Sequence, residues 1–376
     1  MRIAVNTRFL LSDYLEGYGR FLDETLKRIT RDHPEHDFLF IFDRPFDQRF
    51  IYGPNVQGIV QGPRARHPLL WKWWYNFAVP GVLKKYRAQI FLSPDGFCSL
   101  TTKLPQCLVV HDLAFLHVPD SLPPSQLRYY RRNTPRFLEQ ARVIVTVSEF
   151  SKRDICSQYP VDPGRVFVIP NAARENFGPV TAGVKQEVKE KYTAGHEYFL
   201  YTGSIHPRKN LINLLRAFSV FKKMQRSSFR LVLAGRLAWK YESFLEALKS
   251  YKYRQDVLLT GYLGENELAR LMASAYAVVY PSLFEGFGLP VIEAMRAGVP
   301  VITSSGTAMQ ELANGAALLA DPRDPGKIAE QLMRIYKDED LRSRLIEKGA
   351  GVAAQYSWER SAALLWSSLE KTLAAT

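Results

Sequence analysis

Short apolar runs alternate with longer amphipathic stretches along most of the chain. The runs are rich in β-branched and aromatic residues, which is typical of strands buried on both faces of a sheet. Those in the first half cover residues 3–6, 38–42, 58–60, 90–93, 107–111, 143–147 and 166–169. Between them, apolar residues recur at helical spacing. Strands that alternate with helices predict an α/β fold with parallel sheets.

A polar break interrupts this alternation near residue 180. It follows Pro170-Asn171-Ala172, and a second series of strand-like runs begins after it. These runs cover residues 198–203, 231–234, 257–260, 276–280, 301–303 and 317–319. Since a chain of 376 residues is too long for one ordinary core, we predict two Rossmann-like domains, 1–180 and 181–355. Residues 356–376 are predicted to form one more helix.

The composition is that of a folded protein without a membrane span. Hydrophobic residues make up 47% of the chain, yet no apolar run approaches the length of about 18 residues that a span needs. The start of the chain lacks the apolar segment of a signal peptide. Three cysteines, Cys98, Cys107 and Cys156, lack the spacing of a metal site and indicate buried thiols. We therefore expect a cytoplasmic protein.

Two glutamates separated by seven residues form the most informative motif. Glu285 follows the apolar run 276–280, and Glu293 lies in the first turn of a helix that Pro290 begins. Open α/β sheets bind ligands where their strands end, and two carboxylates there can hold the hydroxyls of a sugar or ribose. The alternative is a solvated helix start, in which an acid only complements the helix dipole.

The E-x7-E spacing, with Phe-Gly-Leu-Pro between the glutamates, resembles the signature of retaining, nucleotide-sugar-dependent glycosyltransferases of family 4, which have the GT-B fold. The resemblance covers nearly the whole chain and is most specific in residues 199–320. It implies an acceptor-binding first domain, a donor-binding second domain, and a last helix that crosses back to the first domain. It places Glu285 at the transferred sugar and Glu293 at the donor's ribose. The alternative for residues 356–376 is a helix that caps its own domain.

A basic turn between a strand and a helix suits a diphosphate. Arg208 and Lys209 precede Asn210, a residue favoured at helix N-caps, and a helix N-terminus attracts anions. The Pro-Arg-Lys-Asn form resembles the donor-phosphate loop of family 4, which implies that Lys209 neutralises the leaving diphosphate. Many members carry an arginine after the strand-ending glycine, where this chain has Ser204, so Arg208 is expected to supply the second charge.

Other residues at strand ends complete the predicted donor site. Arg236 follows the strand at 231–234, although an exposed arginine without a ligand fits this position equally well. The full set of predicted donor-binding residues is Gly17, Gly19, Gly203, Ser204, Arg236, Tyr262, Leu263, Phe287, Gly288, Leu289 and Glu293. The predicted catalytic residues are His111, Lys209, Arg208 and Glu285. No metal ligand is predicted.

Two features of the first domain are expected to border the site. His111 follows a strand, and family 4 enzymes have a histidine at a comparable strand end that touches the donor sugar. The alternative is a histidine that only packs or forms hydrogen bonds. Gly17 and Gly19 lie in the first strand-to-helix turn, where small residues let a ligand approach the backbone. The third glycine of a dinucleotide fingerprint would fall at Leu22, which disfavours NAD.

The resemblance implies transfer of a hexose, mannose favoured, from a nucleotide diphosphate sugar to a saccharide or lipid-linked saccharide in cell-surface polysaccharide or lipopolysaccharide assembly. The anomeric configuration is retained, the departing phosphate accepts the proton, and neither a metal nor a cofactor is required. GDP-mannose is the favoured donor. The alternatives are a nucleotide-sugar epimerase, an inverting GT-B transferase, and a basic membrane- or nucleic-acid-binding protein that uses GT-B as a scaffold.

Basic residues exceed acids by 13, which favours a polyanionic or membrane-surface partner. The excess is concentrated in residues 61–105, which contain seven Lys or Arg but only one acidic residue. Trp71, Trp73 and Trp74 lie in the same segment. Four arginines follow at 128–136. Aromatic residues among bases suit an anionic bilayer or, less well, a nucleic acid. The alternative is a packed helix with core tryptophans. The bilayer interpretation predicts a peripheral protein at the inner membrane face.

Overall fold

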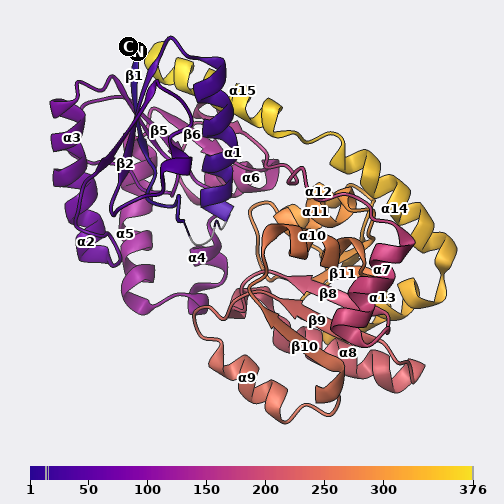
Figure 1. Cartoon of the computed structure of the whole chain (residues 1–376). Helices are drawn as coiled ribbons and strands as arrows, with labels where there is room; N and C mark the ends of the chain where they lie inside the picture. Colours follow the sequence, from indigo (N-terminus) through magenta and orange to yellow (C-terminus); the bar gives the residue numbers. More distant parts are fainter. Residues whose placement is uncertain (13–14, 16, 375–376) are drawn as a thin grey trace. The chain divides into compact units, whose positions relative to one another are not determined.

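The structure is a computed structural model that describes residues 1–12, 15 and 17–374 (Figure 1). By their internal contacts the residues form two compact units. The first unit comprises Met1–Asn171 and Ser357–Thr376, and the second comprises Ala172–Tyr356. The sequence-based boundaries lie at 180 and 355, so the linker segment that begins at Ala172 is part of the second unit.

The first unit contains a seven-stranded parallel sheet with the order β3-β2-β1-β4-β5-β6-β7. Each of the seven apolar runs predicted in this half forms a strand. The strands are β1 (Arg2–Asn6), β2 (Asp37–Phe42), β3 (Val56–Val60), β4 (Ile90–Ser93), β5 (Gln106–Val109), β6 (Val143–Thr146) and β7 (Val166–Val168). The buried residues of β1, β4, β5 and β6 explain the near-continuous apolar pattern of these runs.

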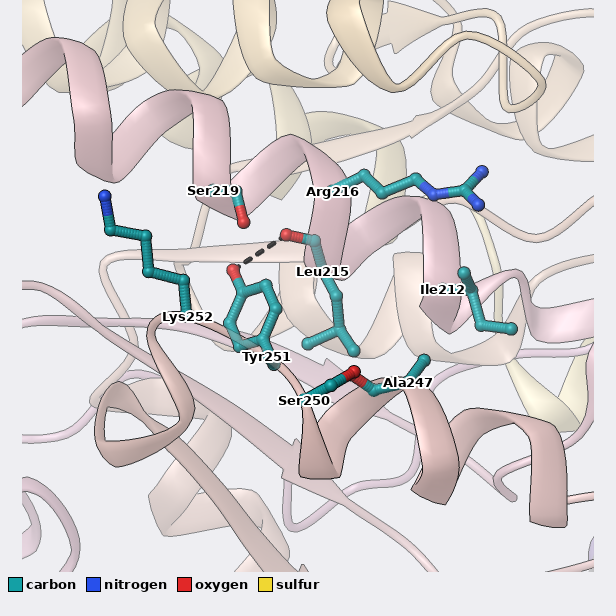
Figure 2. Close-up of a pocket in the computed structure, with 8 residues that line it drawn as sticks. All are labelled: Ile212, Leu215, Arg216, Ser219, Ala247, Ser250, Tyr251 and Lys252. Carbon is teal, nitrogen blue, oxygen red and sulfur yellow. Dashed lines mark hydrogen bonds between the residues drawn. The ribbon is translucent and has the colours of Figure 1, made fainter.

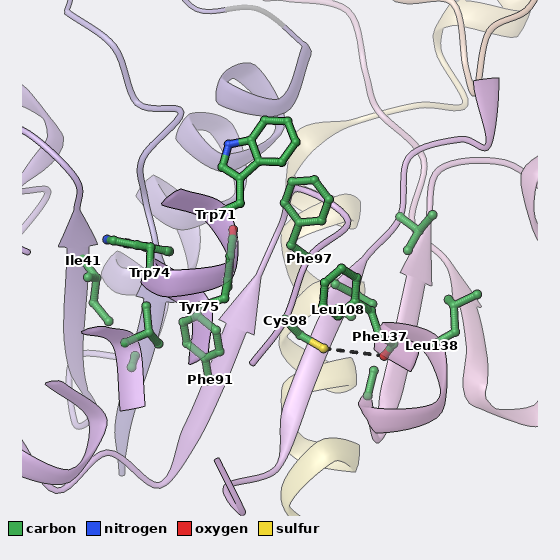
Figure 3. Close-up of a cluster of buried hydrophobic side chains, with 14 of the residues drawn as sticks. Ile41, Trp71, Trp74, Tyr75, Phe91, Phe97, Cys98, Leu108, Phe137 and Leu138 are labelled. Carbon is green, nitrogen blue, oxygen red and sulfur yellow. Dashed lines mark hydrogen bonds between the residues drawn. The ribbon is translucent and has the colours of Figure 1, made fainter. Parts of the chain in front are cut away.

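Helices cover both faces of this sheet. They are α1 (Gly17–Asp32), α2 (Pro68–Trp73), α3 (Val79–Lys85), α4 (Ala114–His117), α5 (Pro124–Gln140), α6 (Glu149–Gln158) and α15 (Trp358–Ala374). A π-helical turn, Trp74–Ala78, joins α2 to α3. Figure 3 shows Trp71, Trp74, Tyr75, Phe97 and Phe137 in one buried cluster against β4 and β5. These aromatic side chains attach α2 and the π-helical turn to the sheet.

The last helix packs on the first unit although it follows the second unit in sequence. α15 lies beside α1, as Figure 1 also shows, and it contacts β4, β5 and β6. Arg28 Nε lies 2.7 Å from Glu359 Oε1, and Trp366 stacks on His33 with ring centroids 3.7 Å apart. Arg142 donates a hydrogen bond of 3.2 Å to the Thr372 carbonyl.

The second unit contains a six-stranded parallel sheet with the order β10-β9-β8-β11-β12-β13. Its strands are β8 (Tyr198–Thr202), β9 (Arg230–Ala234), β10 (Val257–Gly261), β11 (Ala277–Tyr280), β12 (Val301–Ser304) and β13 (Leu318–Ala320). Its helices are α7 (Ala182–Thr193), α8 (Leu211–Gln225), α9 (Glu242–Lys249), α10 (Glu265–Ala273), α11 (Leu289–Arg296), α12 (Ala308–Ala313), α13 (Pro325–Lys337) and α14 (Glu339–Ala353). All six predicted runs again form strands.

Both strand orders reverse direction at one point, between β1 and β4 in the first sheet and between β8 and β11 in the second. Loops that leave the carboxyl ends of such strand pairs diverge, and open α/β sheets bind ligands in the resulting crevice. Each unit therefore has one sheet edge at which polar residues are of special interest.

The structure also bears on the cysteines and on the question of a membrane span. Cys98 and Cys107 are buried as predicted, but the prediction was wrong for Cys156, which is half-buried. Among the described residues, no helix combines the length and hydropathy that crossing a membrane requires.

Candidate functional site

A buried charge cluster lies at the strand edge of the second unit, where β8 and β11 end. Lys209 Nζ lies 2.5 Å from Glu285 Oε1, and an Arg208 guanidinium nitrogen lies 3.1 Å from Glu285 Oε2. Ser282 donates a hydrogen bond of 2.6 Å to the same carboxylate. Lys209 also donates to the Tyr280 hydroxyl. The structure thus brings three of the four predicted catalytic residues into direct contact.

The electrostatics of this cluster keep Glu285 ionised. Burial is the largest influence on its pKa and would raise it, because a carboxylate loses hydration in the interior. The charges of Arg208 and Lys209, with the hydrogen bonds from Lys209 and Ser282, outweigh burial and lower the pKa to about 2. The site therefore combines a fixed negative charge with two positive charges within one buried network.

Local sequence explains how the two cations reach Glu285. His206 accepts from the Arg208 N–H and caps a 3-10 turn, Pro207–Lys209, which places both side chains ahead of α8. Asn210 stands at the N-cap position as predicted, but the prediction that its side chain caps the helix was wrong. Its backbone is left-handed, with φ of 63°, and its amide donates to the carbonyls of Pro281 and Pro322. Asn210 thereby ties the basic turn to the loop that carries Glu285.

Glu293 lies in a second, separate ion pair. It projects from α11 and is buried, and its Oε1 accepts from Arg174 Nε at 2.6 Å. Burial is the largest influence on the pKa of Arg174 and would lower it, but the charges of Glu293 and Glu265, with the hydrogen bond to Glu293, raise the pKa overall. Arg174 also lies over the Phe177 ring, 4.2 Å from its centroid. Arg174 was not among the predicted site residues, because it lies 119 positions from Glu293 in sequence and the pair leaves no local pattern.

Three predicted donor residues lie in a row at the ends of β8, β9 and β10. Gly203 follows β8, Gly235 follows β9 and Gly261 is the last residue of β10, and the next residue is Ser204, Arg236 or Tyr262, respectively. Backbone hydrogen bonds join the row, from Gly203 to Ala234, from Ile205 to Arg236 and from Gly235 to Gly261. A Cβ on Gly235 would lie 1.9 Å from the Gly203 carbonyl oxygen, so no larger residue fits there. Tyr262 is exposed and Leu263 is half-buried.

The remaining donor residues of the second unit lie on the loop between the two glutamates. Phe287 is buried and packs edge-on against Tyr356, with ring centroids 5.7 Å apart. Gly288 precedes α11 in a left-handed conformation, and Leu289 is the first residue of that helix. The helix begins at Leu289 rather than at Pro290, which occupies its second position.

In the first unit, the structure brings His111 together with the Gly17–Gly19 turn. The Tyr18 ring stacks at a tilt on His111, with centroids 4.4 Å apart. A Cβ on Gly19 would lie 2.5 Å from the Phe9 carbonyl oxygen, whereas one on Gly17 would meet no atom within 4 Å among the described residues. Gly19 therefore permits close packing of α1 against the loop at Phe9.

His111 is buried and lies 3.1 Å, through Nε2, from the Pro94 carbonyl oxygen. Since a carbonyl only accepts, Nε2 carries the proton and Nδ1 is the acceptor. Burial lowers the pKa of His111 to about 4 and outweighs Asp112 and the Pro94 carbonyl, which raise it. The ring is therefore neutral at physiological pH and can accept a hydrogen bond from a hydroxyl group.

A buried polar cluster beside His111 was missed from the sequence. Asp95 follows β4 and accepts from Arg8 Nε at 2.6 Å, from Asn6 Nδ2 at 3.0 Å and from the Tyr75 hydroxyl at 2.6 Å. All four residues are buried at the reversal point of the first sheet. The signal that could have found them is a polar residue at the end of one apolar run, Asn6, and an acid two residues after another, Asp95. Asp95 fixes the loop whose Pro94 carbonyl orients His111.

The second unit also has a pocket away from these clusters. It lies between α8 and α9, as Figure 2 shows, and its volume is about 270 Å³. Its lining residues are Ile212, Leu215, Arg216, Ser219, Ala247, Ser250, Tyr251 and Lys252. The Tyr251 hydroxyl donates a hydrogen bond to the Leu215 carbonyl, so this tyrosine holds the segment after α9 against α8. None of the predicted site residues lines the pocket.

Comparison with known proteins assigns the family. The family model described as glycosyl transferases group 1 matches residues 184–352, and that of glycosyltransferase family 4 matches residues 16–175. O-antigen chain mannosyltransferase B of Escherichia coli is 29% identical over 303 residues, 80% of this chain and 77% of that protein. O-antigen chain mannosyltransferase RfbU of Salmonella typhimurium is 27% identical over 296 residues, 77% of each protein.

Sucrose-phosphate synthase from Thermosynechococcus elongatus has a similar fold, with a TM-score of 0.81 over 100% of both chains and 21% identity. This similarity and the two parallel sheets confirm the predicted GT-B class of fold. The two family models together match most of the chain, and we conclude that it belongs to the family 4, or group 1, glycosyltransferases.

Proposed function

We propose that the protein transfers a hexose from a nucleotide diphosphate sugar to a saccharide or lipid-linked saccharide acceptor, with retention of the anomeric configuration. The observation that carries the proposal is the contact of Arg208 and Lys209 with Glu285 at a sheet edge. Two cations and a carboxylate in one buried network suit a reactant whose diphosphate is anionic and whose sugar becomes cationic as the bond breaks.

The charges of the cluster match those that develop during transfer. When the bond between the anomeric carbon and the diphosphate oxygen breaks, negative charge grows on that oxygen, and Lys209 and Arg208 stabilise it. Positive charge grows on the sugar ring beside the ionised Glu285. The acceptor oxygen forms the new bond on the same face of the ring, and its proton passes to the departing phosphate. This scheme uses no metal ion.

The proposal gives a role to several of the residues predicted at the strand ends. Glu293, held by Arg174, accepts hydrogen bonds from the ribose hydroxyls, and the row at Ser204, Arg236 and Tyr262 borders the phosphates and the base. His111, as a neutral ring with Nδ1 available as an acceptor, binds a hydroxyl of the donor sugar.

Mannose is the favoured sugar and GDP-mannose the favoured donor. Support comes from the curated relatives, two of which are named O-antigen chain mannosyltransferases. The same names support a role in lipopolysaccharide assembly, with a lipid-linked acceptor and a protein that works at the inner face of the membrane.

The first test is a thermal-shift panel of GDP-, UDP- and ADP-sugars. A ligand that binds only the folded state stabilises it and so raises the melting temperature. At a ligand concentration a hundred times its Kd, the stabilisation is about 2.7 kcal/mol. We expect GDP-mannose to stabilise the wild type and Glu293→Ala to lose most of that response. Glu246→Ala is the matched control, because Glu246 lies exposed on α9. Absence of a shift with every nucleotide sugar would refute the donor site.

The stereochemical part needs its own measurement. NMR of the anomeric proton during transfer from GDP-α-mannose should show an α-linked product, and activity should survive EDTA. A β-linked product would instead establish an inverting transferase, and a changed sugar configuration without transfer would establish an epimerase. Loss of activity in EDTA that Mg²⁺ restores would contradict the metal-free scheme.

A further inference from the structure

A line of large apolar side chains projects outward from α2 and the π-helical turn. Leu69, Trp73 and Phe77 have exposed fractions of 75%, 44% and 62%. They are four residues apart, which places them on one side of a helix. Exposure of single apolar residues is ordinary, but three large ones in a row on one helical face mark an interaction surface.

The opposite side of the same helices is firmly attached to the core. Trp71, Trp74 and Tyr75 are buried, and Figure 3 shows them within the aromatic cluster of the first unit. Trp71 donates to the Ala65 carbonyl and Trp74 to the Gln61 carbonyl, each at 2.7 Å. The tryptophans of this segment therefore divide into two groups, since Trp71 and Trp74 pack in the core while Trp73 faces solvent.

The surroundings of this apolar line are strongly basic. The chain contains no Asp or Glu between Asp47 and Asp95, and Asp95 is itself buried against Arg8. α5 packs beside α2 through Trp71 on Tyr129, with ring centroids 5.3 Å apart. The exposed basic residues of α2, α3 and α5 are Lys72, Lys84, Lys85, Arg128, Arg131, Arg132 and Arg136, and Arg64, Arg66 and Arg87 lie just outside α2 and α3.

We propose that Leu69, Trp73 and Phe77, with the basic residues around them, dock the enzyme on an anionic lipid bilayer. Apolar side chains on a short helix enter the boundary between headgroups and acyl chains, and surrounding Lys and Arg attract acidic headgroups. We call this set of residues the docking surface. The docking surface adds to the proposed function a place where the enzyme binds the membrane. It rests on the proposed function in one respect, the lipid-linked acceptor.

The docking surface is connected to the polar cluster of the first unit. Trp73 and Phe77 flank Tyr75, whose hydroxyl donates to Asp95 at the reversal point of the sheet. One helical segment therefore faces the bilayer on one side and the acceptor half of the enzyme on the other. A nucleic acid would use the arginines and would stack on Trp73 and Phe77, but it would leave Leu69, the most exposed of the three, without an apolar partner, so the bilayer is the better match.

Vesicle flotation tests the proposal. The wild type should float with phosphatidylcholine vesicles that contain about one-third phosphatidylglycerol, and binding should weaken with salt. Trp73→Ser with Phe77→Ser should weaken binding by at least about tenfold. Arg128→Gln, Arg131→Gln and Arg132→Gln together should weaken it by about a hundredfold, at about fivefold for each arginine.

Matched controls lie in the second unit. Leu237→Ser with Trp239→Ser removes two exposed apolar side chains, and Lys223→Gln, Lys252→Gln and Lys348→Gln together remove three exposed cations. Both control sets should float like the wild type. Equal loss in the control and the docking-surface variants would overturn the proposal, as would equal binding to pure phosphatidylcholine. Salt-sensitive binding to arbitrary DNA without vesicle binding would also overturn it.

Tryptophan quenching locates the contact. Trp73 and Trp239 are the exposed tryptophans of the described chain, and the other four are buried. In a Trp239→Phe background, brominated lipid should quench the fluorescence of Trp73, and Trp73→Phe should abolish that quenching. The docking-surface variants should keep the GDP-mannose thermal shift and transfer to a soluble acceptor. Failure of both the vesicle and nucleotide assays in the wild type would count against both proposals, whereas vesicle failure alone would count only against the docking surface.

Discussion

Replacing Glu285 by glutamine should have two opposite effects on the second unit. The substitution keeps the size of the side chain and removes its charge, so Arg208 and Lys209 lose their shared counter-ion. The folded state without ligand should become less stable. Because the cluster gains one net positive charge, a nucleoside diphosphate should bind more tightly while transfer is lost.

The structure gives the size of the first effect. The pKa of Glu285 falls from 4.5 to about 2, and each pH unit corresponds to about 1.4 kcal/mol, so ionisation in the folded state contributes about 3 kcal/mol. Loss of one partner from a buried ion pair typically costs about 3–5 kcal/mol, which agrees. For a unit of this size, about 3 kcal/mol lowers the melting temperature by roughly 6–12 °C.

The pH dependence follows from the direction of the shift. Since the folded pKa lies below the unfolded value, the stabilisation is fully present above pH 4.5 and is lost as the pH falls toward 2. Calorimetric melts of wild type and Glu285→Gln at pH 7 and at about pH 3.5 should therefore show a smaller difference at the lower pH. Repeating the pH 7 melts with GDP should show a larger ligand-induced shift in the variant.

Glu246→Gln is the control, because Glu246 forms an exposed pair with Lys249 that should contribute less than about 1 kcal/mol. Equal stability of Glu285→Gln and wild type at pH 7 would refute the buried ion pairs. A difference that does not change with pH would refute the ionised carboxylate. Weaker binding of GDP to the variant would show that Glu285 does not compete with the diphosphate for the cations.

Three further outcomes are expected. Gly235→Ala should destabilise the protein by about 3 kcal/mol or more in chemical unfolding, because its Cβ would overlap the Gly203 carbonyl, whereas Gly264→Ala, with open space around it, should change stability by less than about 1 kcal/mol. His111 should stay neutral in an NMR titration from about pH 8 to pH 5, since burial lowers its pKa to about 4, and protonation in that range would contradict the buried site. Arg174→Met should destabilise the second unit by about 3–5 kcal/mol in calorimetry and reduce the thermal shift with GDP-mannose, because it leaves a buried carboxylate without its counter-charge.

The strands were predictable because parallel strands buried on both faces leave continuous apolar runs, and all thirteen runs form strands. Contacts between distant residues left no such pattern. Arg174 and Glu293, or Arg8 and Asp95, are ordinary charged residues in sequence, and only the fold brings them together. The prediction that the Asn210 side chain caps α8 was wrong for a related reason. Its side-chain amide donates hydrogen bonds to two carbonyls of other loops rather than capping its own helix.

The tryptophan-rich segment shows a limit of a different kind. Composition identified aromatic residues among bases but could not divide them between core and surface. Apolar residues occupy nearly every position from Leu69 to Val79, so the apolar pattern alone does not mark one face of this segment as the core face. The burial of Trp74 and Tyr75 and the exposure of Trp73 and Phe77 became evident only in the folded chain.

The packing of α15 on the first unit has a consequence for how the chain is made. Residues 172–356 are contiguous, so the second unit can fold as soon as it has left the ribosome. The first unit is synthesised earlier, yet its packing is complete only when α15 has been made, because Glu359 of this helix pairs with Arg28. Until then the side of its sheet that α15 covers stays open, and a nascent chain stalled after Tyr356 would present that apolar face to chaperones.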